Sequence, residues 1–174
     1  MFLRLFFLDV KKSGITNLYS QATVNVFSKQ DLSNNKEEDF SIKPYRMGPD
    51  LIYQTKSGVL LLLTANFVRT YTIHATAPVY KDGKHHEAEE LYNCYIQSLN
   101  LVRDYDIRTI LIPLISTKYG FPIKEAWYQA LKACYTWGEM NKKHTIHVTI
   151  TADSDEEYEL GKEMNKFFRH GKME

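Results

Sequence analysis

The stretch IRTILIPLISTKYGFPIKEAW, residues 107–127, decides the fold. Its first part, Thr109 to Ile115, is a nearly unbroken apolar run, which is typical of a strand buried on both faces of a sheet. The run leads directly into the small polar segment Ser116–Phe121, and Ile123 to Asn141 then places apolar side chains at helical spacing. A strand, a short turn and a helix form the repeating unit of an α/β domain.

The same alternation of patterns extends along the 174 residues. Amphipathic stretches predict two more helices, at 87–105 and 153–169, and apolar or β-branched runs predict further strands at 3–10, 22–27, 58–65, 71–75 and 145–151. The polar residues 28–47 predict at most one helix, which Ser33 or Asn34 would cap and Pro44 would end. We therefore expect a single α/β domain, residues 1–174, with a mostly parallel sheet covered on both faces.

The composition is that of an ordinary globular protein, with 44% hydrophobic residues, 25% charged residues and a net charge of +1. Such a charge gives no global field toward nucleic acid or an anionic membrane, and the scattered basic residues leave a nucleic-acid surface possible but unsupported. The apolar residues 1–10 are too short to span a bilayer and have no cleavage-site pattern after them. Cys94 and Cys134 lack CxxC spacing, so we expect two buried thiols in a reducing compartment, with the cytoplasm as default location.

Ligands of open α/β sheets bind beyond the carboxyl ends of the strands, which selects Asp9-Val10, residues 25–28 and Ser116–Phe121. The third place is the best candidate, because backbone N–H groups between a strand and a helix N-terminus can converge on an anion. The alternative is an ordinary strand-to-helix turn. Ser116 and Thr117 would add hydroxyls there, Lys118 a positive charge, and Tyr119 or Phe121 an aromatic wall, and Gly120 is the glycine of the segment.

Two single residues and the histidines complete the candidates. Asp9, at the end of the first strand, could accept a hydrogen bond from an amino group such as that of adenine, or face water. Asn25 lies within an apolar run and would need partners if buried, either a ligand hydroxyl or a backbone group. The six histidines lack zinc-site spacing, and the chain contains no nucleophile elbow, Walker loop or HExxH, so neither a metal nor a catalytic set is predicted.

Several stretches together resemble the macro domain family. LLLTANFVRTYTIHATAPVY (61–80) is similar to the family's strand–loop–strand that ends in an "IHTVGP"-like segment, and residues 107–127 are similar to its signature "SIAFPxISTGxYGFPxxxAA". Upstream, LFFLDV (5–10) resembles the strand with "GDI", and TVNVFS (23–28) resembles "IVNAAN". The resemblance runs over roughly residues 3 to 150 and implies a three-layer α/β/α sandwich with a mixed, mostly parallel central sheet.

The resemblance also implies a ligand, because the family's usual ligand is ADP-ribose. Transferred by position, Asp9 would hold the adenine amino group with the backbone of Val10 beside it, and Ser116–Phe121 would form the second phosphate loop. Asn25 matches the first asparagine of "NAAN", whereas Ser28 replaces the asparagine that usually contacts the distal ribose. No cofactor is implied beyond this ligand.

Two departures from the family pattern keep the function open. Residues 29–47 contain no glycine where the family has a run of them, and glycine permits close approach of the backbone to phosphate. Lys118 stands for the first glycine of "STGxYG", and no acidic residue aligns clearly with that of the hydrolase members. The chain is therefore read as a module that binds ADP-ribose, free or on a protein, or a related nucleotide. The alternatives are a hydrolase of ADP-ribosyl groups or O-acetyl-ADP-ribose, and a diverged domain that binds protein or RNA.

Overall fold

The computed structural model describes residues 6–13, 20–28, 51–54, 60–65, 71–115 and 117–170. One seven-stranded sheet in the order β1-β7-β6-β2-β5-β4-β3 forms its centre. From β1 to β5 all neighbours in this order are parallel, whereas β4 runs antiparallel to both β5 and β3, so the mixed, mostly parallel sheet is confirmed. The strands are β1 Phe6–Lys12, β2 Ala22–Ser28, β3 Leu51–Gln54, β4 Leu60–Ala65, β5 Tyr71–Ala77, β6 Thr109–Pro113 and β7 Ile146–Ala152.

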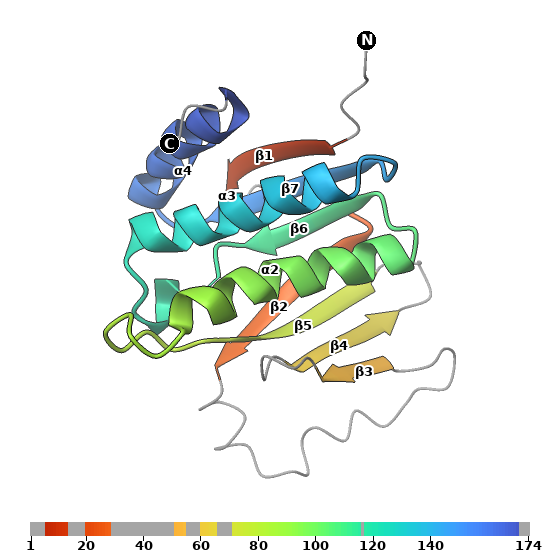
Figure 1. The fold of residues 1–174 in the computed structure, drawn as a ribbon, viewed down its shortest axis with the longest axis horizontal. Helices are drawn as coiled ribbons and strands as arrows, with labels where there is room; N and C mark the ends of the chain where they lie inside the picture. The colour runs from red at the N-terminus through yellow and green to blue at the C-terminus, as the bar shows by residue number, and fades with distance from the viewer. Residues whose placement is uncertain are drawn as a thin grey trace.

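The described helices are α2 Glu87–Asp104, α3 Ile123–Met140 and α4 Asp155–His170, together with the single 3₁₀ turn η1, Thr117–Tyr119. Helices α2 and α3 cross one face of the sheet, and α4 lies beside β1 (Figure 1). The helix predicted within residues 28–47 falls outside the described residues. Among the helices described, none combines the length and apolar character needed to cross a bilayer.

The alternation of side chains along the strands explains why α2 and α3 cover this face. Ile146, Val148 and Ile150 of β7 are completely buried beneath the helices, while His147 between them is partly exposed. The inner stripes predicted for the two helices are confirmed, because each of their members is fully buried: Leu91, Tyr95, Ser98, Leu99 and Val102 on α2, and Trp127, Ala130, Leu131 and Cys134 on α3.

A glycine lets α4 approach α3 closely. A Cβ added at Gly161 would lie 2.3 Å from Cζ2 of Trp127, and the indole Nε1 of Trp127 donates to the carbonyl oxygen of Glu157 at 2.8 Å. At the start of α4, Ser154 Oγ accepts the N–H of Glu157 at 3.1 Å, and the Glu157 carboxylate accepts the N–H of Ser154 at 3.3 Å. The predicted capping box is therefore confirmed.

Helix α4 also contacts β1, the outermost strand on that side of the described sheet. Asn165 Nδ2 and Arg169 Nη2 donate to the carbonyl oxygen of Leu8 at 3.4 and 3.1 Å. The hydroxyl of Tyr135 on α3 donates to Asn165 Oδ1 at 2.7 Å, which fixes the amide in this orientation. The helix is thus held to the sheet by polar contacts as well as by packing.

The structure extends one predicted strand and adds another that was not predicted. The first strand was expected to end at Asp9-Val10, but β1 continues to Lys12, which pairs with Ala152 of β7. An edge strand tolerates such charged residues, so the end of the apolar run was not the end of the strand. Strand β3, Leu51–Gln54, was not predicted, because its four residues are too few for a clear periodicity.

Candidate functional site

The carboxyl ends of the parallel strands meet at one edge of the sheet, which we call the carboxyl edge. The strands end there at Lys12, Ala152, Pro113, Ser28 and Ala77. The described segments that leave this edge include the β5–α2 loop (residues 78–86), the β6–α3 turn (114–122, described except for residue 116) and the β7–α4 junction (153–154). Open α/β sheets bind their ligands in this position.

The start of the β6–α3 turn is fixed from two sides. The backbone N–H of Leu114 donates to the carbonyl oxygen of Thr151 at 2.8 Å, which ties the turn to β7. The N–H of Ile115 donates to the hydroxyl oxygen of Tyr95 at 2.9 Å, and Tyr95 is a fully buried side chain of α2. Burial raises the pKa of this phenol well above its usual value, so it stays neutral.

The remainder of the β6–α3 turn depends on Gly120. Its φ of 86° lies in the left-handed region that favours glycine, and its N–H donates to the carbonyl oxygen of Thr117 at 3.2 Å. Phe121 then turns into the core, where it is 3% exposed, whereas the Lys118 side chain is 77% exposed. The predicted turn between strand and helix is present, and it presents a lysine to the outside.

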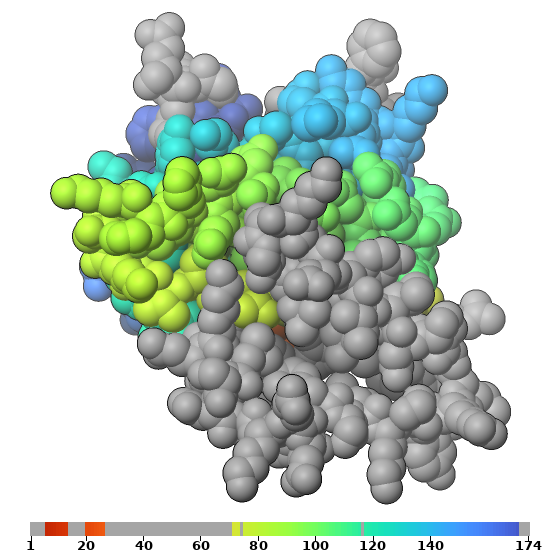
Figure 2. Space-filling view, turned by 60° about the horizontal axis from the view of Figure 1, so that its bottom comes forward, coloured from red at the N-terminus to blue at the C-terminus, as the bar shows by residue number. Residues whose placement is uncertain are grey.

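Tyr80 connects the β5–α2 loop with the β6–α3 turn. Its N–H donates to the carbonyl oxygen of Tyr119 at 3.0 Å, and its ring lies 5.0 Å from that of Phe121 between centroids. Figure 2 shows the yellow-green side chains of the loop and of the first turns of α2 together on one flank of the molecule. Tyr80 is not among the residues predicted from the sequence, although its place just after a strand that ends at the carboxyl edge was the available signal.

The β5–α2 loop is closed by the buried carboxylate of Glu87, which is 3% exposed. Its Oε1 accepts the N–H groups of Lys81 and Asp82 at 3.1 and 3.4 Å, and its Oε2 accepts that of His85 at 2.6 Å. Burial alone would raise the pKa of Glu87, but these backbone hydrogen bonds and that of its own N–H outweigh it and lower the pKa to about 2.

The same loop brings three potential metal-ligand atoms, from Asp82, His85 and Glu87, within 4.8 Å of one another. His85 Nδ1 lies 2.9 Å from Asp82 Oδ1. Because both oxygens of Glu87 already accept backbone hydrogen bonds, the grouping is accounted for by loop closure. That no metal binds stays a prediction.

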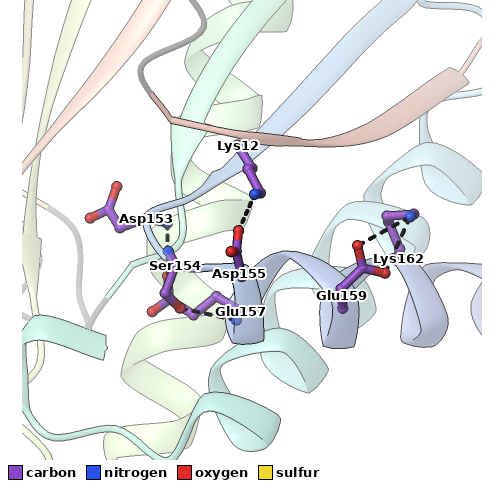
Figure 3. A network of polar contacts seen from close by, with 7 residues as sticks. All are labelled: Lys12, Asp153, Ser154, Asp155, Glu157, Glu159 and Lys162. Atoms are coloured by element: carbon purple, nitrogen blue, oxygen red, sulfur yellow. Dashed lines mark hydrogen bonds and ion pairs between the residues drawn. The ribbon is translucent and has the colours of Figure 1, made fainter.

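Lys118 is paired across the carboxyl edge with Asp153. Its Nζ lies 3.4 Å from Asp153 Oδ2, and Ser13 Oγ, just beyond β1, donates to Asp153 Oδ1 at 2.6 Å. The hydrogen bond from Ser13 lowers the pKa of Asp153; burial opposes it, and the charge of Lys118 lowers it further. Figure 3 shows that the neighbouring Lys12 pairs separately with Asp155.

Asp9 and Asn25 do not come together. Asp9 lies in the middle of β1, where its Oδ2 is 2.9 Å from Nε2 of His147, so its predicted position at a strand end is wrong. Asn25 is exposed rather than buried, so it needs no partner within the protein. The order of the sheet places their strands three spacings apart, about 14 Å.

The remaining predicted residues are placed as follows. The side chain of Val10 is buried, 9% exposed, and belongs to the core. Ser28 ends β2 at the carboxyl edge, and Ser116 lies outside the described residues. The ligand contacts predicted for Asp9, Val10, Asn25, Ser28 and Ser116 stay predictions.

Comparison with known proteins identifies the family. The macro domain model matches residues 50–130. A macro domain-containing protein of Listeria monocytogenes serotype 4b is 34% identical over 122 residues, covering 63% of this chain and 69% of that protein. Another, from L. monocytogenes serovar 1/2a, is 38% identical over 104 residues, covering 53% of this chain but only 59% of that protein. The chain belongs to the macro domain family.

A human protein named ADP-ribose glycohydrolase MACROD2 is 34% identical over 103 residues, 56% of this chain and 24% of that protein. Among solved structures, a mutant of the Oceanobacillus iheyensis macrodomain matches with a TM-score of 0.71 at 22% identity, covering 94% of this chain and 93% of that one. A second mutant of the same macrodomain, with ADPR, has a TM-score of 0.68 at 23% identity and covers 94% of both chains. These matches confirm the predicted α/β/α sandwich.

Proposed function

We propose that this protein binds ADP-ribose, free or attached to a protein, at the carboxyl edge of its sheet. The observation that carries the proposal is the β6–α3 turn, in which Gly120 adopts φ 86° and the Lys118 side chain is exposed. The eighteen-residue helix α3 begins directly after the turn, and the N-terminus of a long helix favours an anion. Charge and helix dipole therefore both support a pyrophosphate at this place.

The family supports the class of ligand. One of the matching Oceanobacillus structures contains ADPR, and the human relative is named after ADP-ribose. Because residues 29–47 lack the glycines that bring backbone N–H groups close to phosphate, we expect more of the anion recognition to fall on Lys118. The positive charge of the Lys118 side chain would supply part of the phosphate binding that glycine backbone N–H groups would otherwise supply.

Calorimetric titration with ADP-ribose, with AMP and ATP as controls, tests the proposal. We expect selective binding of ADP-ribose, and a lower affinity in Lys118→Ala, with the larger difference at low salt. Lys142→Ala is the matched control, because Lys142 is an exposed lysine beyond the far end of α3. If no binding is detected, the ADP-ribose proposal fails, and protein or RNA partners become the hypothesis to test.

The human relative's name also favours a second candidate function, hydrolysis of an ADP-ribosyl bond. In that case binding energy and phosphate electrostatics would position a water for attack. Release of ADP-ribose from a mono-ADP-ribosylated protein, or loss of O-acetyl-ADP-ribose, is the measurement. Asn25→Ala and Ser28→Ala should lower turnover with the fold intact, and full activity in both would exclude these residues from the site.

A further inference from the structure

The contact between Lys118 and Asp153 joins two segments that leave neighbouring strands of the carboxyl edge. Lys118 belongs to the turn after β6, and Asp153 follows β7 directly. The side chains are 77% and 50% exposed, so a ligand at this edge has access to both groups. A negatively charged ligand that approaches Lys118 therefore meets a carboxylate at the same place.

The two partners differ in how firmly they are held. Asp153 Oδ1 accepts the Ser13 hydroxyl at 2.6 Å, and its own N–H donates to Glu157 Oε2 at 2.8 Å. The ammonium group of Lys118, by contrast, sits at the end of a flexible exposed side chain. When a competing anion arrives, the lysine is the group that moves, and the carboxylate stays in place.

We propose that Asp153 is an internal counterion that competes with the ligand's phosphate for Lys118 and thereby sets the affinity for anionic ligands. The inference rests on the proposed function and adds a residue that weakens binding. The ligand gains Lys118 only by displacing Asp153, and Asp153 then repels the bound phosphate. Exposed ion pairs contribute little each, so we expect Asp153→Asn to tighten binding by about threefold to tenfold.

Two anionic probes test this, ADP-ribose and inorganic pyrophosphate, each titrated calorimetrically at low and at high salt. The variants are Asp153→Asn, Lys118→Met and the double variant. Asparagine keeps an oxygen that can accept the Ser13 hydroxyl, so the variant removes the negative charge and can retain this hydrogen bond. The matched control is Asp155→Asn, which removes an acid two residues away that pairs with Lys12 instead.

The proposal requires that Asp153→Asn bind more tightly than wild type and than Asp155→Asn, with a smaller gain at high salt. It also requires that most of the gain disappear when Lys118 is methionine, which a double-mutant cycle measures. Equal gains in affinity in Asp153→Asn and Asp155→Asn would mean that only the net charge of the protein matters, and this would overturn the proposal. A full gain without Lys118 would overturn it as well.

The two probes separate this inference from the proposed function. If pyrophosphate binds and responds to Asp153→Asn while ADP-ribose does not bind, the counterion role stands and the proposed ligand is wrong. If wild type binds ADP-ribose and Asp153→Asn leaves both affinities unchanged, the ligand stands and the counterion role is wrong. If neither probe binds to any variant, both fail. Thermal unfolding of each variant confirms that the fold is retained.

Discussion

The hydroxyl oxygen of Tyr95 accepts the backbone N–H of Ile115 at 2.9 Å, so a helix side chain fixes the first residues of the β6–α3 turn. Tyr95→Phe would leave that N–H buried without its acceptor, which costs about 1–3 kcal/mol. We expect lower stability and weaker ADP-ribose binding together, measured by urea unfolding and calorimetry. Tyr92→Phe, on the same helix, is the control; if it has the same effects, the hydrogen bond is not their cause.

Gly161 is a position at which the packing of α4 on α3 leaves no room for a side chain. Any side chain there begins 2.3 Å from Trp127, so Gly161→Ala should destabilise the protein by roughly 1–3 kcal/mol despite alanine's better helix propensity. Chemical denaturation measures the difference. Lys162→Ala, at the partly exposed neighbouring position, should change stability by less than about 0.5 kcal/mol. A neutral Gly161→Ala would mean that α4 can move away without cost.

The buried carboxylate of Glu87 makes the free energy of unfolding depend on pH. Its pKa of about 2 in the folded protein is below its ordinary value of 4.5, so its stabilising contribution is complete above about 4.5 and is lost as the pH falls toward 2. Glu87→Gln should therefore be less stable than wild type near neutral pH, with the difference shrinking through this window. Urea midpoints at a series of pH values measure it, with the exposed Glu89→Gln as control. A difference independent of pH would contradict the role of the charge.

Both cysteines should be unreactive in the folded protein. Cys94 and Cys134 are completely buried, and burial raises the pKa of the Cys134 thiol well above its ordinary value of 9.0. Because the thiolate is the reactive form, we expect no modification by a thiol-specific reagent in native buffer and two modified thiols after unfolding. Rapid modification of one cysteine in the native protein would disagree with this packing.

Local patterns predicted much of the fold. The stripes of α2 and α3, the capping box at Ser154 and the parallel sheet all follow from spacing within short segments. The end of β1 and the strand β3 did not, because each is decided by pairing with a neighbouring strand rather than by its own composition. Register is a property of two strands, and a single strand's sequence carries only part of it.

The candidate site was less predictable for the same reason. The β6–α3 turn is contiguous in sequence and was found, including Gly120 with its positive φ. Asp153 lies far from Lys118 in the sequence and pairs with it only because β7 and β6 are neighbours in the sheet. Ser13 in turn reaches Asp153 because β1 adjoins β7. The predicted position of Asp9 at a strand end is wrong because the apolar run ends before the strand does.

The hydrogen bonds from Asn165 and Arg169 to the Leu8 carbonyl oxygen affect more than the position of α4. An outermost strand with free backbone groups is a template on which another chain can continue a sheet. Helix α4 occupies the Leu8 carbonyl oxygen of β1, the outermost strand on that side of the described sheet, so another chain could not use this group for pairing while the helix is in place.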